Sequence, residues 1–247
     1  MDGIGKEFME KTKYQNVTES MQRRGLPQPP LEYMYDTSLE LIKLPSVKDL
    51  PHFPIDLKIA VERRKTLRNY QQIPLTVDEM TFLLWFTQGV KEINNNKITK
   101  RTVPSAGARH AFETYLLINH VDGISPGLYR YLALEHALLP VISGQDITQN
   151  VTGACLDQQQ ISSSAITFIW VAIKERMYWR YGERGYRYLH LDAGHVCQNL
   201  CLGAEAIGSG VCAIAAFDDD QLNTVLELDG ENRFVIYLGT VGKKQIE

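Results

Sequence analysis

Long apolar runs, cysteine and a strong net charge are all missing or scarce in this chain of 247 residues. No stretch approaches the roughly eighteen apolar residues needed to cross a bilayer, and the first residues carry no basic segment that leads into an apolar one. The formal charge of -3 provides no general attraction to nucleic acid or to an acidic membrane surface. We therefore expect a cytoplasmic protein with neither nucleic acid nor membrane among its partners.

Recognisable metal and nucleotide motifs are also missing. The four cysteines fit neither the spacing of a zinc ribbon nor that of a CxxC redox pair, and no HExxH, P-loop or deaminase metal signature occurs. Cys197 and Cys201 stand four apart on a predicted buried helix, so we interpret them as packing thiols. A Rossmann domain is disfavoured because no strand-helix repeat carries a glycine-rich phosphate turn, and we predict no metal site.

What is present is a globular composition, because 44% of the residues are hydrophobic, which is ample for a buried core. Residues 1–54 are polar, punctuated by prolines and without sustained periodicity. We predict that they form an extended N-terminal arm, and that this arm lies on a single domain made of residues 55–247.

Capping residues and apolar spacing predict two helices early in the domain. Thr76 and Glu79 have the spacing of a capping box, and they start a helix that ends at Gly89. Asp56 can cap an earlier helix over residues 57–64. The apolar contacts of this earlier helix are expected from three residues, Ile59, Ala60 and Val61.

Four strands and a further helix complete the predicted domain. Residues 165–173 form an almost continuous run of apolar, β-branched and aromatic residues, which indicates a strand buried on both faces at the centre of a sheet. Asp192 can cap a helix that ends at Gly208, and residues 91–100, rich in asparagine and lysine, are expected to form a loop. The other strands are expected at residues 113–118, 128–132 and 234–241.

Residues 63–68, Arg-Arg-Lys-Thr-Leu-Arg, place four cations and one hydroxyl at the end of the first predicted helix. Guanidinium groups bind phosphate oxygens in pairs, and the Thr66 hydroxyl can fill a remaining hydrogen-bond site, so phosphate is a fitting ligand. A solvated basic helix end that complements the helix dipole explains the same residues. The cluster alone does not decide between these two interpretations.

Two stretches of small residues can approach a flat ligand closely. Residues 104–108, Pro-Ser-Ala-Gly-Ala, form a turn whose backbone amides can reach the heteroatoms of a planar ring without interference from side chains. Residues 213–217, Ala-Ile-Ala-Ala-Phe, can cover the other face of such a ring. An ordinary loop and a buried strand end are the alternative interpretations of these two stretches.

Together these segments resemble the nitroreductase family of flavin mononucleotide (FMN) enzymes, and most closely its SagB-type dehydrogenase branch. The resemblance extends from about Leu57 to Lys243 and rests on motifs that follow one another in the family's order. These are Arg64-Lys65-Thr66-Leu67-Arg68-Asn69-Tyr70, Arg-Thr-Val-Pro-Ser-Ala-Gly at 101–107, Gly-Leu-Tyr-Arg-Tyr at 127–131, Tyr-Gly-Glu-Arg-Gly-Tyr-Arg-Tyr at 181–188, Ala-Gly-His-Val-Cys-Gln-Asn-Leu at 193–200, and the element that ends at Phe217.

The resemblance implies an α+β fold, in which a central mixed sheet is flanked by helices, and a homodimer whose two FMN sites lie at the subunit interface. The phosphate and ribityl chain of FMN would be held by Arg64, Lys65, Thr66 and Arg68, with a further phosphate contact from Lys243. The isoalloxazine ring is expected against the small-residue turn of the opposite subunit and close to the backbone before Phe217. The residues assigned to the ring are Pro104, Ser105, Ala106, Gly107, Ala215 and Ala216.

Arg180-Tyr181 departs from the branch, because its azoline-forming dehydrogenases carry a Lys-Tyr pair at this place, in which the lysine can act as a base. Arginine stays protonated and cannot take up a proton. Tyr181 is therefore the remaining candidate for a catalytic residue, and oxidation of peptide thiazolines or oxazolines is disfavoured. His195 is interpreted as a hydrogen-bonded packing histidine, while His110, which follows the turn, is a weaker candidate for substrate contact.

These observations favour an oxidoreductase in which NADH or NADPH gives a hydride to FMN and a nitro compound, a quinone or a similar small acceptor is reduced. Paired carboxylates and a Ser-His-Asp arrangement are missing near the small-residue turns, which suits chemistry carried by a flavin. Two alternatives stay open. One is dehydrogenation of an azoline-type peptide or another carbon substrate, and the other is a non-catalytic flavin-binding subunit whose arm recruits a partner.

Overall fold

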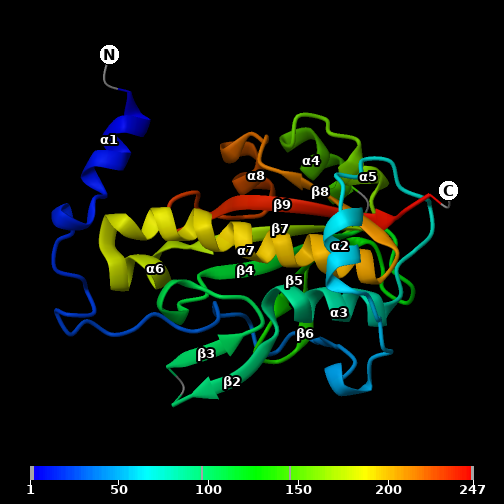
Figure 1. The fold of residues 1–247 in the computed structure, drawn as a ribbon, viewed down its shortest axis with the longest axis horizontal. Coiled ribbons are helices and arrows are strands. Elements are labelled where there is room, and N and C mark those ends of the chain that lie inside the picture. The colour runs from blue at the N-terminus through cyan, green and yellow to red at the C-terminus, as the bar shows by residue number, and fades with distance from the viewer. Residues whose placement is uncertain (1–2, 96, 145, 246–247) are drawn as a thin grey trace.

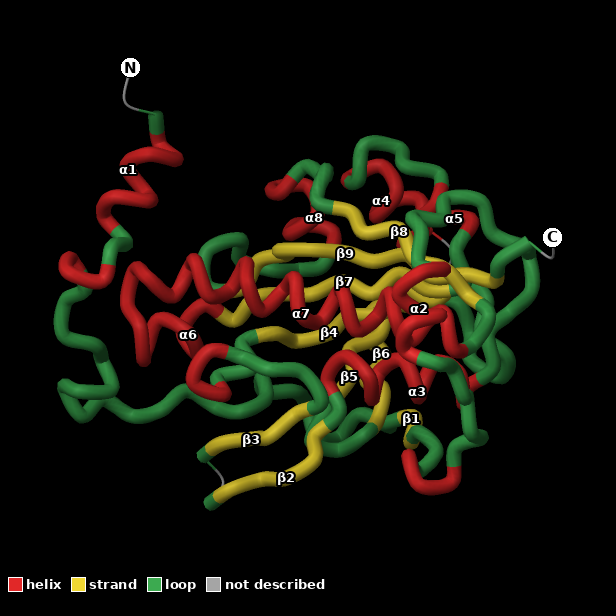
Figure 2. Tube along the Cα trace, viewed as in Figure 1, coloured by secondary structure: helices red, strands yellow, loops and turns green. Residues whose placement is uncertain are grey.

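The computed structural model describes residues 3–95, 97–144 and 146–245. Its centre is a seven-stranded sheet with the strand order β1-β6-β5-β4-β7-β9-β8, and a separate two-stranded sheet pairs β2 with β3 (Figures 1 and 2). The strands of the large sheet are β1 (Ile42–Lys43), β4 (Phe112–Ile118), β5 (Gly127–Leu132), β6 (Ala137–Ser143), β7 (Ile166–Ile173), β8 (Ser209–Ile214) and β9 (Arg233–Lys243). The predicted strands near 113, 128, 165 and 234 are thereby confirmed.

The large sheet is antiparallel at every pairing of its described strands, so the expectation of a mixed sheet is wrong here. Strands β4, β5 and β6 follow one another through turns, and such short connections require antiparallel neighbours. Parallel pairing occurs only as isolated bridges in the described residues, such as the bridge of Thr66 with Val211 on the open edge of β8.

Helices cover both faces of the sheet, and strand β7 shows how the two layers form. All eight residues of β7 are buried, and it pairs with β4 and β9. Phe168 and Trp170 enter one core with residues of α3 (Val77–Gln88) and α7 (Gly185–Ala206). Ile169 and Val171 enter the other core with residues of α4 (Asp146–Ala154) and α8 (Asp219–Val225). The predicted burial of this strand on both faces is confirmed.

Helix α7 is longer than predicted, because it starts at Gly185 and not after Asp192. Leu189 is buried, and Gly185 packs closely on Met177 of α6 (Lys174–Tyr181), so the first two turns are held by tertiary contacts. Asp192 therefore lies inside the helix, where its carboxylate serves another partner. Neither α7 nor any other helix in the described ranges combines the length and apolar character that crossing a membrane requires.

The two predicted helix starts before residue 90 are confirmed. The Thr76 Oγ1 accepts a hydrogen bond from the Glu79 amide at 3.2 Å, and the Glu79 carboxylate accepts one from the Thr76 amide. Asp56 caps α2 (Leu57–Arg63) by accepting from the amide of Ile59. The expected apolar contacts hold for Ala60 only, because the side chains of its neighbours Ile59 and Val61 are exposed.

The segment expected to be a loop after α3 is a hairpin of β2 (Val90–Asn94) and β3 (Ile98–Arg101). Asn95 adopts a positive φ of 51°, which asparagine tolerates at a turn. Lys100 pairs with Glu92 across the hairpin at 2.8 Å. The polar composition therefore reflects exposed strand faces that carry cross-strand pairs, and the prediction of a loop was wrong.

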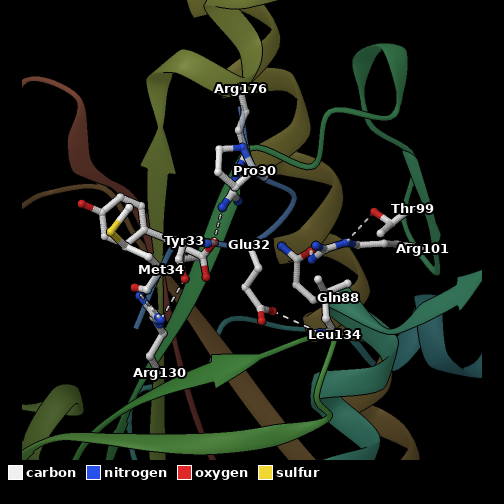
Figure 3. A network of polar contacts seen from close by, with 11 residues as sticks. Pro30, Glu32, Tyr33, Met34, Gln88, Thr99, Arg101, Arg130, Leu134 and Arg176 are labelled. Carbon is white, nitrogen blue, oxygen red and sulfur yellow. Dashed lines mark hydrogen bonds and ion pairs between the residues drawn. The ribbon is translucent and has the colours of Figure 1, made fainter. Parts of the chain in front are cut away.

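The residues before α2 contain α1 (Ile4–Lys11), short 3-10 turns at Tyr14–Asn16 and Val47–Asp49, and the edge strand β1. Buried charges hold the middle of this segment against the sheet (Figure 3). Arg176 Nε donates to the carbonyl of Pro30 at 2.8 Å, and Arg130 donates to the carbonyls of Tyr33 and Met34. The segment thus lies on the domain through specific contacts, while its separation from the domain at residue 54 stays a prediction.

Candidate functional site

The cationic loop, which we define as residues 63–68, leaves the end of α2 and runs along the edge of β8. The amide of Leu67 donates to the carbonyl of Val211 at 3.0 Å, and the Leu67 side chain lies over Gly210. A Cβ at position 210 would lie 2.7 Å from Leu67, so glycine permits this contact. Tyr70 closes the loop by donating from its buried hydroxyl to the Leu67 carbonyl.

The charged and hydroxyl residues of the cationic loop are exposed, while its backbone is fixed to β8. The exposed residues are Arg63, Arg64, Lys65, Thr66 and Arg68. Neither Arg64 nor Arg68 forms an ion pair with a carboxylate among the described residues. Their positive charge is therefore uncompensated within this part of the chain, and the set of guanidinium, ammonium and hydroxyl groups is one that binds phosphate.

Lys243, predicted to add a phosphate contact, lies at the end of β9 and outside the cationic loop. Its Nζ pairs with the Glu79 carboxylate and donates to the carbonyl of Ile207 at 2.8 Å. A phosphate would have to compete with Glu79 for this lysine. Lys243 is the last residue of β9 and does not lie among the exposed cations of the cationic loop. Its phosphate contact stays a prediction.

The small-residue turn, which we define as residues 104–108, is fixed by a buried carboxylate of α7. Asp192 accepts from the amide of Ala106 at 3.2 and 3.3 Å, and the Ser105 Oγ accepts from the amide of His110. Burial raises the pKa of Asp192, while hydrogen bonds from Ser105 and Ala106 oppose this rise. Sequence reasoning missed this role, because a contact across 86 positions leaves no local signal.

Gly107 lies at the closest contact of this turn. It has a positive φ of 58°, and a Cβ there would lie 2.5 Å from the Tyr181 hydroxyl and 2.8 Å from Arg180 Nε. Arg109 Nε also donates to the Gly107 carbonyl at 3.0 Å. The structure therefore brings the predicted catalytic Tyr181 into contact with the turn predicted to border the ring.

Ala215 and Ala216 follow the end of β8, and their small side chains are exposed. The Ala216 carbonyl accepts from Gln158 Nε2 at 2.7 Å, which fixes the backbone at this point. The cationic loop lies beside the first half of β8, where Thr66 forms a bridge with Val211. One strand therefore connects the predicted phosphate-binding residues with the predicted ring-facing backbone.

The small-residue turn and the cationic loop lie at different levels of α7. The turn contacts Asp192, whereas the charge of Arg64 acts on Cys201, nine positions further along the helix. At about 1.5 Å per residue this separates the two groups by roughly 14 Å along the helix axis. That the turn of the opposite subunit borders the ring stays a prediction.

The two histidines lie in opposite environments. His195 is exposed on α7 with its Nδ1 4.0 Å from Asp192 Oδ1, so its interpretation as a packing histidine is wrong. His110 is buried, and burial together with the charge of Arg101 lowers its pKa to about 3. A buried imidazole of this kind is neutral and is covered from substrate.

His110 gives a testable pH dependence of stability. Its ordinary pKa of 6.5 is depressed in the fold, so below about pH 6.5 the unfolded chain takes up a proton that the folded chain does not. The contribution to stability is present above the unfolded pKa and is lost as the pH falls toward the folded value. Between about pH 7 and about pH 5, the native chain should lose about 2 kcal/mol more unfolding free energy than His110→Asn. Urea titrations at both pH values measure this, and equal losses would refute it.

Cys197 and Cys201 behave as the packing thiols predicted. Cys197 belongs to the core between α7 and the sheet, and Cys201 packs against it. Their mutual hydrogen bond raises the pKa of Cys197 and lowers that of Cys201. Within the described ranges, no group of three or more His, Cys, Asp or Glu side chains is arranged to hold a metal ion.

Comparisons with known proteins show the family and the fold of the chain. The family model of the nitroreductase family matches residues 61–243. A candidate nitroreductase of Methanocaldococcus jannaschii is 32% identical over 203 residues, which cover 82% of this chain and 96% of the relative. The trifolitoxin-processing protein TfxB of Rhizobium leguminosarum is 28% identical over 163 residues, 63% of this chain and 44% of TfxB. The crystal structure of a candidate nitroreductase of Anabaena variabilis superposes with a TM-score of 0.71 at 28% identity, covering 85% of this chain and 42% of that one.

Proposed function

Because the chain belongs to the nitroreductase family, which implies an oxidoreductase, we propose that it is an FMN-dependent enzyme that uses NADH or NADPH to reduce small acceptors such as nitro compounds or quinones. The observation that carries the proposal is the cationic loop. Its backbone is fixed to β8 while its guanidinium and hydroxyl groups stay exposed. Such a set of donors fits the phosphate and ribityl hydroxyls of FMN.

The chemistry divides between cofactor and protein. When bound, FMN would supply the redox chemistry, which is the transfer of two electrons and a proton from reduced nicotinamide to the acceptor. The acceptor would gain its second proton separately. The residues of the chain hold and orient the cofactor and the acceptor. Asp192 fixes the turn at Ala106, and Gly107 leaves room for the Tyr181 hydroxyl, which can donate a hydrogen bond or a proton to an acceptor next to the turn.

The cationic loop provides the direct test of the proposal. Arg64→Gln combined with Arg68→Gln removes two charges that have no carboxylate partner among the described residues, so the dissociation constant of FMN should rise by about tenfold to a hundredfold. Fluorescence titration of the cofactor-free protein with FMN measures this. Lys58→Gln is the matched control, because Lys58 is an exposed cation of the same helix that pairs with Glu62. An unchanged affinity in the double variant would exclude this loop as the phosphate site.

We further propose that the protein is a homodimer in which each FMN contacts both chains. Helix α7 exposes a stripe with the spacing of one helix face, formed by Leu191, Gly194, His195 and Gln198. Leu191 is 60% exposed, and Leu57 and Val61 of α2 expose further apolar surface. Exposed apolar side chains on two neighbouring helices suit a protein interaction surface, and a second chain on this surface would bring its own small-residue turn toward the cationic loop.

Leu191→Arg tests the dimer. A charge at the centre of a dry interface costs several kcal/mol, so the variant should be a monomer at micromolar concentration while the native chain is a dimer. Size-exclusion chromatography with light scattering distinguishes the two masses. Leu156→Arg is the control, because Leu156 has a similar exposure but follows α4 on the other side of the sheet. A native monomer, or a dimeric Leu191→Arg variant, would contradict the proposed interface.

Dehydrogenation of an azoline-type peptide is the second candidate, and the similarity to a trifolitoxin-processing protein favours it. The position of Arg180 weighs against it, because a guanidinium beside Gly107 cannot act as a base. Anaerobic bleaching of the flavin distinguishes the two functions. Bleaching by NADH or NADPH supports acceptor reduction, whereas bleaching by an azoline peptide alone would reverse the ranking.

A further inference from the structure

The N-terminal arm and the end of α6 enclose a cavity of about 450 Å³, which we call the arm cavity. We propose that the arm cavity binds the carboxylate of an aromatic electron acceptor, so that the enzyme prefers acidic acceptors to neutral ones of the same size. This inference rests on the proposed function and names the substrate class for it. The residues that carry the argument are Tyr14, Glu19, Arg23, Arg180, Tyr181 and Arg184, all of which line the cavity.

The walls of the arm cavity are built by contacts between distant segments. The amide of Gln22 donates to the Trp179 carbonyl, and Trp179 Nε1 donates to the Leu26 carbonyl, both at 2.9 Å. Arg184 fastens the other side by donating to the carbonyl of Thr12 at 2.7 Å. The volume suits a small molecule, and the cavity is held open by hydrogen bonds on two sides.

The cavity carries a net positive charge. Three guanidinium groups, those of Arg23, Arg180 and Arg184, face a single carboxylate, that of Glu19. None of the three arginines forms an ion pair with a carboxylate of the described chain. The hydrogen bonds of Arg184 go to neutral acceptors, the Thr12 carbonyl and the Tyr188 hydroxyl, so its charge remains.

A fourth cation, Arg109, adds to the positive charge next to the cavity. Arg109 is buried, lies 5.4 Å from the centre of the Trp179 ring and has no carboxylate partner among the described residues. Its Nε donates to the Gly107 carbonyl at 3.0 Å, and Arg180 Nε lies beside the same glycine, so the two guanidinium groups are close together. Burial and the charge of Arg180 lower the pKa of Arg109. Two neighbouring guanidinium groups without a counter-ion are stabilised by an anion, and a carboxylate matches their planar donors.

The arm cavity reaches the predicted redox site through Arg180 and Tyr181. Both residues line the cavity, and both contact Gly107 of the small-residue turn. The rings of Tyr14 and Tyr181 supply aromatic surface within the same cavity. An aromatic acid whose carboxylate is held by the arginines would therefore lie next to the turn at which we propose the flavin ring.

The test compares para-nitrobenzoate with its neutral analogue para-nitrobenzamide as electron acceptors. Arg23→Gln should weaken the apparent affinity for the acid relative to the amide, raising the ratio of their Michaelis constants by about tenfold, because a charge-assisted hydrogen bond is lost. Arg24→Gln, an exposed neighbour that does not line the cavity, should leave this ratio unchanged. Equilibrium dialysis of para-nitrobenzoate against the native protein, Arg23→Gln and Arg24→Gln should show weaker binding for Arg23→Gln only.

The outcomes separate this inference from the proposed function. If neither acceptor is reduced with NADH or NADPH, the proposed function fails, and the dialysis still decides whether the cavity binds the carboxylate. If both acceptors are reduced with equal Michaelis constants and Arg23→Gln changes neither the ratio nor the dialysis, the inference alone is overturned. A selective loss of apparent affinity for NADPH over NADH in Arg23→Gln, with an unchanged acceptor ratio, would assign the cavity to the nucleotide phosphate and also overturn it.

Discussion

Glu113→Ala is expected to lower the free energy of unfolding by about 3–5 kcal/mol, because it leaves the buried guanidinium group of Arg176 without its counter-charge. The Glu113 carboxylate pairs with Arg176 at 2.5 Å, and both side chains are at most 4% exposed. It also accepts from the Tyr33 amide at 2.8 Å, so the same change frees the backbone of the arm. Urea denaturation of the native chain and the variant measures the difference.

Glu92→Ala is the matched control for this prediction. Glu92 also pairs with a cation, Lys100 at 2.8 Å, but both of these side chains are about half exposed. Exposed pairs contribute about 0–1 kcal/mol. If Glu113→Ala were no more destabilising than Glu92→Ala, the buried network would not be what holds the arm on the domain.

Gly107→Ala is expected to lower the unfolding free energy by about 2–5 kcal/mol and to weaken FMN binding by at least about tenfold. Its positive φ of 58° strains any residue with a Cβ, which costs about 1–2 kcal/mol. The new Cβ would also lie 2.5 Å from the Tyr181 hydroxyl, so the turn or the tyrosine must move, at a cost of about 1–3 kcal/mol. Denaturation and FMN titration measure the two effects separately.

Gly123→Ala isolates the backbone part of this effect. Gly123 has a similar φ of 76°, but a Cβ there would meet nothing within 4 Å. Its replacement should cost only the backbone strain and leave FMN binding unchanged. Equal effects at positions 107 and 123 would show that the contact of the turn with Tyr181 has no role in the site.

Local signals were sufficient for the parts of the fold that are determined locally. The capping box of Thr76 and Glu79 marks the start of α3, since both hydrogen bonds form within one turn. The apolar run of β7 likewise predicted a fully buried strand. Such elements need no knowledge of what packs on them.

Predictions failed where distant contacts determine the structure. Helix α7 continues through Asp192, a residue favourable at helix caps, because its carboxylate binds the amide of Ala106. Ile59 and Val61 were expected to supply apolar contacts, yet the side chains of both are exposed. The mixed sheet, which was inferred from resemblance, was wrong because the described strands pair with antiparallel neighbours.

The candidate site could be predicted only in part, because some of its residues meet through distant contacts. The sequence identified the cationic loop and the small-residue turn, because their residue types carry the chemistry. It did not identify Asp192 as the group that fixes the turn, nor the cluster of Arg109 and Arg180, because these depend on segments about 70 to 90 positions apart that meet only in the fold.

The absorbance spectrum of the purified protein, with mass identification of the released cofactor, tests the central claim most directly. The account predicts a flavin spectrum, a released compound with the mass of FMN, and bleaching by NADH or NADPH in the absence of oxygen. A colourless protein that does not take up added FMN would contradict the account and would leave the chain as a non-catalytic member of the family.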